Sequence, residues 1–327
     1  MIKEHKLSRS TRQNIVLLII LATLMVIFSL QNGKFLSMYN IMNIVRQNVP
    51  QVIIACAMAF VISSGAIDLS VAGVMALSAV VYGKLCVAGV NPWFAILVVM
   101  VLGIAMGFIN NLITQQLNVP AIMATMATWL FSAGLALTIC KAIPISDPEV
   151  KPITILNKTK FFGSIPLALL IVILVVALFV FLEKKTIVGK YAIAIGGNAN
   201  AAMFSGINVN RMRFIFFALC STMAALAGVW QVARIGSADP KIGVGMEFNV
   251  ISACILGGVN IKGGEGTIFG VVTGTYLLAV LTNGMQMMDI SLFYQQVVIG
   301  AALLIAVLIN SLTSIRASKK AARLVTA

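Results

Sequence analysis

Ten apolar stretches follow one another along the chain, separated by short polar or glycine-rich segments. They cover residues 15–30, 49–64, 69–90, 93–113, 121–140, 164–182, 214–233, 248–260, 267–282 and 293–313. A helix that crosses a bilayer needs about 20 apolar residues, and most of these stretches come near that length. The pattern therefore predicts an all-α, polytopic membrane protein with about ten transmembrane helices. The stretch 248–260 is too short to span, so we expect it to begin earlier or to break inside the membrane.

The composition supports this fold class and excludes two others. Hydrophobic residues make up 60% of the 327 residues and charged residues only 10%, against about 25% in an ordinary soluble domain. A soluble enzyme of this length needs more polar side chains to cover its surface, and a disordered chain is less hydrophobic. We therefore treat residues 1–327 as a single transmembrane domain.

The positions of the basic residues predict the orientation of the chain. Of the 23 Lys and Arg residues, 14 lie in the 1–13 tail, the 183–213 loop, the 314–327 tail and at Lys262. Because basic residues gather in cytoplasmic segments, both termini are predicted to be cytoplasmic. The first apolar stretch is not followed by a small-residue cleavage site, so it is interpreted as a retained anchor rather than a signal peptide. Topology thereby explains the net charge of +14, and no nucleic acid partner is expected.

The segment 183–213 is the one cytoplasmic connection of substantial length. Asn198 follows two glycines and is predicted to cap a short helix over 199–205, which Gly206 can end. Short helices joined by glycines suit docking to a partner at the membrane face. A plain surface linker is the alternative, and the residues alone do not decide between the two. The other long loop, 141–163, contains three prolines and is predicted to lie on the opposite side.

A weak internal repeat relates two glycine-rich interruptions, residues 62–73 and 256–270. Each contains one acid, Asp68 in the first and Glu265 in the second, and each leads into a helix of small residues. Paired interruptions in two halves of a membrane protein are typical of a transport pathway at the repeat interface. Two interpretations of Asp68 stay open: a functional acid at membrane depth, or a helix cap with Ser70 nearby.

The chain lacks the residues that common membrane enzymes require. It has no G-x-x-x-x-G-K-[ST] phosphate-binding loop, its single histidine is His5 in the N-terminal tail, and no close pair of acids lies at an inner membrane end to hold Mg²⁺. We therefore predict no catalytic residues, no cofactor and no metal ion. The five cysteines lie within or beside apolar stretches without paired spacing, which predicts buried, reduced thiols.

Five ordered motifs resemble those of the permeases of ribose-type sugar ABC importers. Residues 65–78 read G-A-I-D-L-S-V-A-G-V-M-A-L-S and are similar to the family's G-G-I-D-L-S-V-G signature. Residues 119–125 resemble its V-P-x-F-I-x-T stretch. Three further segments resemble motifs of the family: residues 194–209 its cytoplasmic loop, residues 257–270 its late glycine-rich stretch, and residues 283–300 its last motif. The resemblance extends from about residue 35 to residue 315, nearly the whole chain.

The resemblance implies a permease subunit of an ATP-driven importer for a monosaccharide such as ribose. In this family two permeases pair in the bacterial inner membrane, as a homodimer or as a heterodimer with a paralogue. A cytoplasmic ATP-binding subunit hydrolyses ATP, so the permease itself is not an enzyme, and an extracytoplasmic binding protein delivers the sugar. Ala66, Ala72 and the pair Ala121–Ile122 depart from the family's usual residues, which leaves the identity of the sugar open.

The positions of the motifs imply the site residues. Candidates near the solute pathway are Gly65, Asp68, Ser70, Asn249, Gly263, Gly264 and Glu265. Candidates for coupling to the ATPase are Gly189, Gly196, Gly197, Asn198, Ala201, Ser205, Gly206, Asn208 and Arg211. The competing hypothesis is a stand-alone secondary transporter of a small neutral solute, in which Asp68 or Glu265 carries the coupling ion. A third class, an integral membrane enzyme, lacks a base, a nucleophile and metal ligands in this chain.

Overall fold

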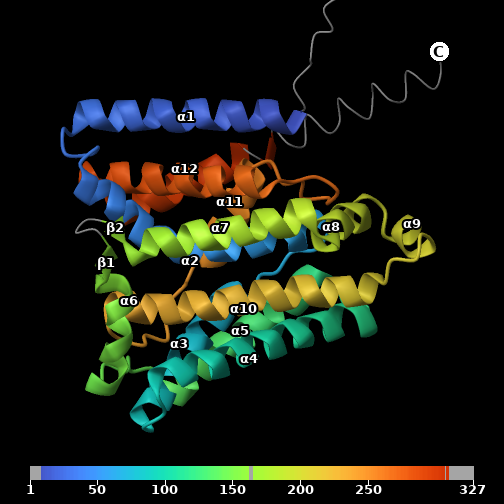
Figure 1. The fold of residues 1–327 in the computed structure, drawn as a ribbon, viewed down its shortest axis with the longest axis horizontal. Coiled ribbons are helices and arrows are strands. Elements are labelled where there is room, and N and C mark those ends of the chain that lie inside the picture. The colour runs from blue at the N-terminus through green and yellow to red at the C-terminus, as the bar shows by residue number, and fades with distance from the viewer. Residues whose placement is uncertain (1–8, 162–164, 306, 309–327) are drawn as a thin grey trace, which may run out of the picture.

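The computed structural model describes residues 9–161, 165–305, 307 and 308, which form long helices packed side by side (Figure 1). The helices are α1 (Arg9–Gln31), α2 (Met38–Ser63), α3 (Val71–Val87), α4 (Pro92–Asn111), the π-helical η1 (Leu112–Gln116), α5 (Ala121–Cys140), the 3₁₀-helical η2 (Pro148–Thr154), α6 (Ile155–Lys158), α7 (Leu167–Lys185), α8 (Ile187–Gly197), α9 (Ala199–Phe204), α10 (Val209–Ile235), α11 (Met246–Leu256), α12 (Ile268–Met287) and a further apolar helix, Leu292–Ile305. Two short strands, β1 (Lys160–Phe161) and β2 (Ile165–Pro166), pair antiparallel.

The all-α membrane fold predicted from the sequence is confirmed. Within the described residues, seven helices are long and apolar enough to cross a membrane: α1, α2, α4 with η1, α5, α7, α10 and α12. Four shorter apolar helices accompany them, namely α3, α8, α11 and Leu292–Ile305. Each predicted stretch overlaps one of these helices, whereas α8 lies in the predicted inner loop. The count of ten spans stays a prediction.

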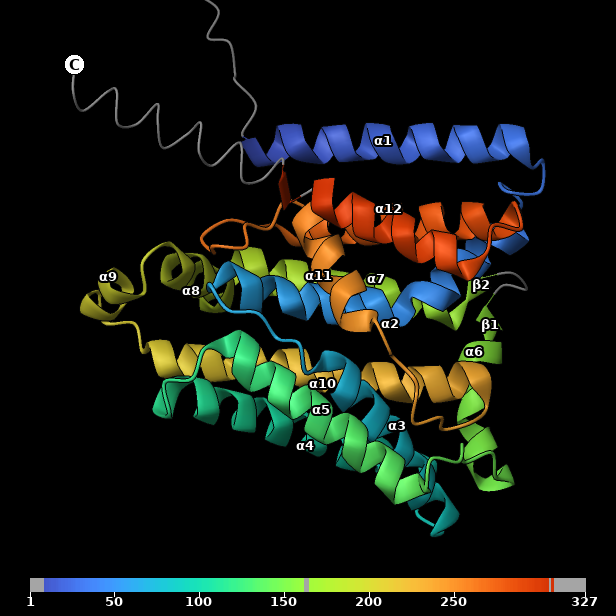
Figure 2. The same ribbon diagram turned by 180° about the vertical axis from the view of Figure 1, so that it is seen from behind.

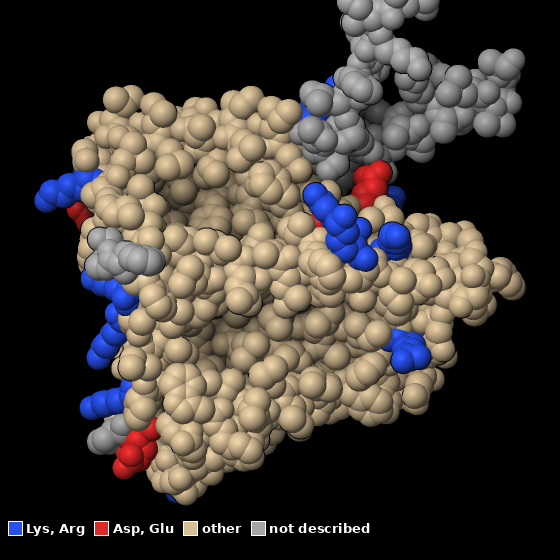
Figure 3. Space-filling view, viewed as in Figure 1, with Lys and Arg blue, Asp and Glu red and all other residues tan. Residues whose placement is uncertain are grey.

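Charged side chains gather at the two ends of the bundle. Figure 3 shows Lys, Arg, Asp and Glu at the end that carries η2, α6 and β1 and at the end that carries α8, with a broad belt between them that shows no charged side chain in this view. An uncharged belt is what contact with lipid acyl chains requires. We call the two ends the α6 end and the α8 end.

α2 lies at the centre of the bundle. All its residues from Val49 to Ser63 are buried, because α2 packs against α7, α10, α11 and α12. α1 lies on the outer side of α12, and α4 and α5 pack on α10 and α3 (Figures 1 and 2).

α3 and α11 are short helices that begin inside the bundle. α11 has 11 residues, or about 16 Å, against a bilayer core of about 30 Å. Figure 2 shows a non-helical segment running into the bundle before each one, residues 64–70 before α3 and 236–245 before α11. The two starts meet, because a Cβ built on Gly243 lies 3.0 Å from the Sδ atom of Met75. The short stretch 248–260 is therefore explained by a break, one of the two predicted alternatives.

The predicted start of the second span, residue 49, is wrong. α2 begins at Met38, and the hydroxyl of Ser37 caps it by accepting the backbone N–H of Asn40 at 3.3 Å. The missed turns carry several amide side chains, which lower the hydropathy of a segment that is nevertheless helical.

Two smaller predictions are confirmed. All five cysteines are free and buried. α9 occupies most of the predicted helix 199–205, with Asn198 Oδ1 accepting the N–H of Ala201 at 3.0 Å. Gly206, with a φ of 84°, follows the end of this helix.

Candidate functional site

Four glycines from three distant parts of the chain meet at the α8 end, and we call this contact the glycine junction: Gly65, Gly196, Gly263 and Gly264. Gly65 follows α2, Gly196 lies in the last turn of α8, and the other two belong to the segment between α11 and α12. The backbone N–H of Gly264 donates to the carbonyl of Ser63 at 2.9 Å. The two predicted interruptions thus lie against each other, and the predicted coupling loop packs on both.

Close backbone approach explains why these positions are glycine. A Cβ on Gly196 overlaps the carbonyl oxygen of Ser63 and lies 2.5 Å from the backbone nitrogen of Gly264. A Cβ on Gly263 lies 2.8 Å from the Cα of Gly196. In addition, Gly65 and Gly263 have φ angles of 82° and 84°, which residues with side chains rarely adopt. The junction is a tight backbone contact that joins the end of α2, the end of α8 and the α11–α12 segment.

A second contact ties the base of α8 to α12. The carboxylate of Glu183, near the end of α7, accepts the N–H of Ile268 at the start of α12 at 3.3 Å. Carboxylates are favourable at helix N-termini, where backbone N–H groups lack partners within the helix. Gly189, in the first turn of α8, packs directly on the backbone of Glu183. The α7–α8 corner therefore contacts the start of α12, and the end of α8 contacts the segment that precedes it.

Asp68 is fully buried just before α3. Its Oδ1 accepts the backbone N–H of Ser70 at 2.9 Å and the Ser70 hydroxyl at 2.6 Å. Ser70 Oγ in turn accepts the side-chain amide of Asn110, from α4, at 2.8 Å. The Oδ1 atom of Asn110 accepts the hydroxyl of Thr128, from α5, at 2.6 Å. Ser70, and not Asp68, is the N-cap residue of α3, and Asp68 accepts the N–H and the hydroxyl of that cap residue. The polar network fixes the start of α3 against α4 and α5, and a functional role for Asp68 stays a prediction.

Removing this carboxylate is expected to destabilise the protein. In Asp68→Ala the N–H and hydroxyl of Ser70 lose their acceptor inside the bundle, and a buried unsatisfied polar group costs about 1–3 kcal/mol. Asp68→Asn keeps an acceptor oxygen and should cost less. Thermal unfolding of the purified protein in detergent measures both variants, and an Asp68→Ala midpoint equal to that of the wild type contradicts the assignment.

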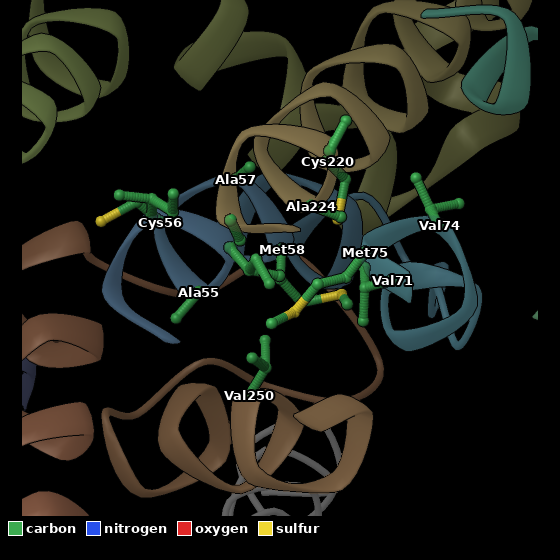
Figure 4. Packing of buried hydrophobic residues seen from close by; sticks show 14 of the residues in the cluster. Ala55, Cys56, Ala57, Met58, Val71, Val74, Met75, Cys220, Ala224 and Val250 are labelled. Carbon is green, nitrogen blue, oxygen red and sulfur yellow. The ribbon is translucent and has the colours of Figure 1, made fainter. Parts of the chain in front are cut away.

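An apolar contact closes the centre of the bundle where α3 and α11 begin. Met58 from α2, Met75 from α3 and Val250 from α11 are fully buried, and Figure 4 shows their side chains pointing toward one another. We call these three residues the apolar closure.

The two remaining predicted pathway residues, Asn249 and Glu265, are not part of the glycine contact itself. Asn249 is partly exposed on α11, and its carbonyl accepts the side-chain amide of Gln51 at 3.2 Å. Glu265 is exposed and borders a recess at the α8 end, next to Gln13 and Asn14 of α1. The structure therefore brings Gly65, Gly263 and Gly264 into one contact, with Glu265 next to Gly264 in the chain and Asn249 elsewhere, on α11.

Most of the predicted coupling residues lie on the surface of the α8 end. Gly197, Asn198, Ala201, Ser205, Gly206, Asn208 and Arg211 are exposed. Gly189 is buried and Gly196 is partly exposed. Met203 and Phe204, which were not among the predicted residues, are 54% and 86% exposed on α9. These two large apolar side chains lie exposed on a helix that protrudes from the bundle (Figure 1).

A row of amides on α2 was also not predicted. Asn40, Asn43, Gln47 and Gln51 recur at intervals of three and four residues, which places them on one side of the helix. The signal was available in that spacing and in the Ser37 cap before it. Among the described residues, no three His, Cys, Asp or Glu side chains come together as ligands for a metal ion.

Comparison with known proteins gives consistent matches over nearly the whole chain. The family model described as branched-chain amino acid transport system / permease component matches residues 40–307. The probable ABC transporter permease protein YphD of Escherichia coli K12 is 38% identical over 93% of this chain and 91% of its own. The ribose import permease RbsC of Bacillus subtilis is 36% identical, over 88% of this chain and 89% of its own.

The D-allose transport system permease AlsC of Escherichia coli K12 is 34% identical, over 90% of each chain. No solved structure gives a significant match. All three relatives are named as permeases; the names of RbsC and AlsC give ribose and D-allose, and the name of YphD gives no solute.

Proposed function

The chain belongs to the ribose-type family of ABC transporter permeases, and we propose that it forms the solute pathway of an ATP-driven importer for a monosaccharide such as ribose, xylose or allose. The glycine junction supports this proposal most directly. It joins the loop expected to meet the ATPase to both interruptions of the membrane helices. A permease needs such a connection, because the energy source lies on another subunit.

We propose that the α8 end is cytoplasmic and that both termini lie on that side of the bacterial inner membrane. The ATPase then binds α8 and α9, where Met203 and Phe204 are exposed. The sugar-binding protein delivers solute at the α6 end. Two permeases, identical or paralogous, pair in the membrane.

The proposed mechanism moves two short helices. Closure of the ATPase on ATP displaces α8 and α9, and the glycine junction passes this displacement to the segments 64–70 and 257–267. These segments lead into α3 and connect α11 to α12. Met75 lies near the start of α3 and Val250 near the start of α11. When the two helix starts move apart, these side chains separate and the apolar closure opens. Asp68 and Ser70 have no exposed surface, so their part is to hold the start of α3 rather than to contact sugar.

A mild-detergent purification of the tagged chain from its own cells tests the proposal. We expect a P-loop ATPase to co-purify in proportion to the permease, identified by mass spectrometry. A second, paralogous permease in the complex indicates a heterodimer, and its absence indicates a homodimer.

Purification of the chain without an ATPase, from cells shown to transport the solute, overturns the proposal. That result favours the ion-driven secondary transporter. Under that alternative, Asp68→Asn removes the pH dependence of uptake, whereas an ATP-driven importer keeps its pH profile.

A further inference from the structure

The first half of α2 carries more polar side chains than a lipid-facing helix tolerates. Asn40, Asn43, Gln47 and Gln51 lie on one side of it over about 16 Å. We call these four residues the amide row. An amide in an apolar environment is costly unless it has a hydrogen-bond partner, so each position needs protein, water or solute opposite it.

The two ends of the amide row have partners in the protein. The side chains of Asn40 and Asn283, from α12, exchange hydrogen bonds of 2.8 and 3.1 Å. Gln51 donates to the carbonyl of Asn249, from α11, at 3.2 Å. These contacts show that the row faces the side of α2 on which α11 and α12 pack.

The two middle members of the row are open. Asn43 and Gln47 are partly exposed, and within the described part of the chain their side chains form no hydrogen bond with protein. The cause is the length of α11, which begins at Met246 and meets α2 only near Gln51. Figure 2 shows α11 beside one half of α2 only. The half of α2 that α11 does not cover is the one nearer the α6 end.

The amide row ends at the apolar closure. Met58 follows Gln51 by seven residues, two helical turns, and therefore lies on the same side of α2. Met58 is fully buried against Met75 and Val250 (Figure 4). One side of α2 thus changes from open amides to a closed apolar contact halfway along the helix.

Amides suit a neutral polyhydroxyl solute. Each offers two donors and an acceptor, which match sugar hydroxyls in either direction, and none adds a charge. We propose that the amide row lines the outer half of the solute pathway, with Asn43 and Gln47 exchanging hydrogen bonds with sugar hydroxyls while Asn40 and Gln51 are held by the protein. This inference rests on the proposed function, since it assigns the solute-facing residues of that importer.

Leucine substitutions test the row with a matched control. Asn43→Leu and Gln47→Leu remove the amides at similar volume. Asn48→Leu makes the same change on a different side of α2, where the amide only bonds the carbonyl of Ile44 in its own helix. Uptake of radiolabelled D-ribose, D-xylose and D-allose is measured in cells that express the ATPase and the binding protein. We expect at least tenfold slower uptake for the two row variants, altered ratios between the three sugars, and a change within twofold for Asn48→Leu.

The complexes are assayed alongside uptake. Each row variant should co-purify with the ATPase and with its partner permease as the wild type does. Uptake within twofold of wild type in both row variants overturns the inference. Loss of the complex in the row variants also overturns it, because the amides then act in folding or in the contact between permeases. If the wild-type complex itself imports none of the three sugars on ATP, the proposed function fails instead.

Cysteine accessibility gives a readout that does not depend on transport. The five native cysteines are buried, so a charged, membrane-impermeant thiol reagent should label the wild type little. We expect labelling of Asn43→Cys and Gln47→Cys from the outer side. Val101→Cys, at a 64% exposed position on the outer face of α4, should stay unlabelled because lipid covers it. Unlabelled cysteines at both row positions overturn the inference.

Discussion

Replacing Gly196 with alanine is expected to abolish sugar uptake and to lower thermal stability, whereas alanine at the adjacent Gly197 leaves both near wild-type values. The two glycines are neighbours in the same predicted coupling loop. A Cβ on Gly196 overlaps the Ser63 carbonyl oxygen, while a Cβ on Gly197 meets nothing within 4 Å. Comparing the two alanine variants therefore distinguishes the effect of close packing at the glycine junction from the effect of removing a glycine's backbone freedom.

The size of the effect follows from what surrounds Gly196. Overpacking a filled site costs about 1–3 kcal/mol and occasionally more. Here the obstructing atoms belong to the backbone of Ser63 and Gly264, so no side chain can turn away to relieve the overlap. We expect the Gly196→Ala midpoint to fall by several degrees in a detergent thermal-unfolding assay, with uptake at least tenfold slower. A Gly196→Ala protein that melts and transports like Gly197→Ala contradicts the junction as described.

Hydropathy predicted most of the helices because their apolar stretches end at polar or helix-terminating residues. The stretch 121–140 coincides with α5, which Pro120 precedes and Lys141 follows in a left-handed C-cap conformation. The start of α2 was missed because its first turns carry polar amides, of which Asn40 is buried and Asn43, Gln47 and Asn48 are partly exposed. Hydropathy measures the cost of contact with lipid, so amides lower it even where the chain is helical.

The glycine junction lay beyond sequence reasoning for a different reason. The repeat identified both interruptions, and the loop motif identified Gly196, yet nothing in either pattern states that residues 65, 196 and 263 touch. Their contact depends on how α2, α8 and the α11–α12 segment end at a common level of the bundle. Only a three-dimensional arrangement contains that information. The motif residues were therefore predicted individually, and their connection was found in the structure.

Replacing Phe204 with aspartate is expected to abolish binding of the ATPase without affecting the fold. Phe204 is 86% exposed at the end of α9, so it contributes little to the stability of the isolated chain. A large aromatic side chain at the centre of a protein contact contributes about 2 kcal/mol or more, which is about 30-fold in affinity. Aspartate also places a charge in a desolvated interface.

Phe161→Asp is the matched control for this prediction. Phe161 is 40% exposed in β1, at the opposite end of the bundle, where no ATPase is expected. Both variants should melt at the wild-type temperature, while only Phe204→Asp should lose the co-purifying ATPase and sugar uptake. If Phe204→Asp retains the ATPase in full, the coupling surface lies elsewhere on the α8 end. If instead Phe161→Asp loses it, the proposed orientation of the chain is reversed, because the energy-coupling subunit then binds the α6 end.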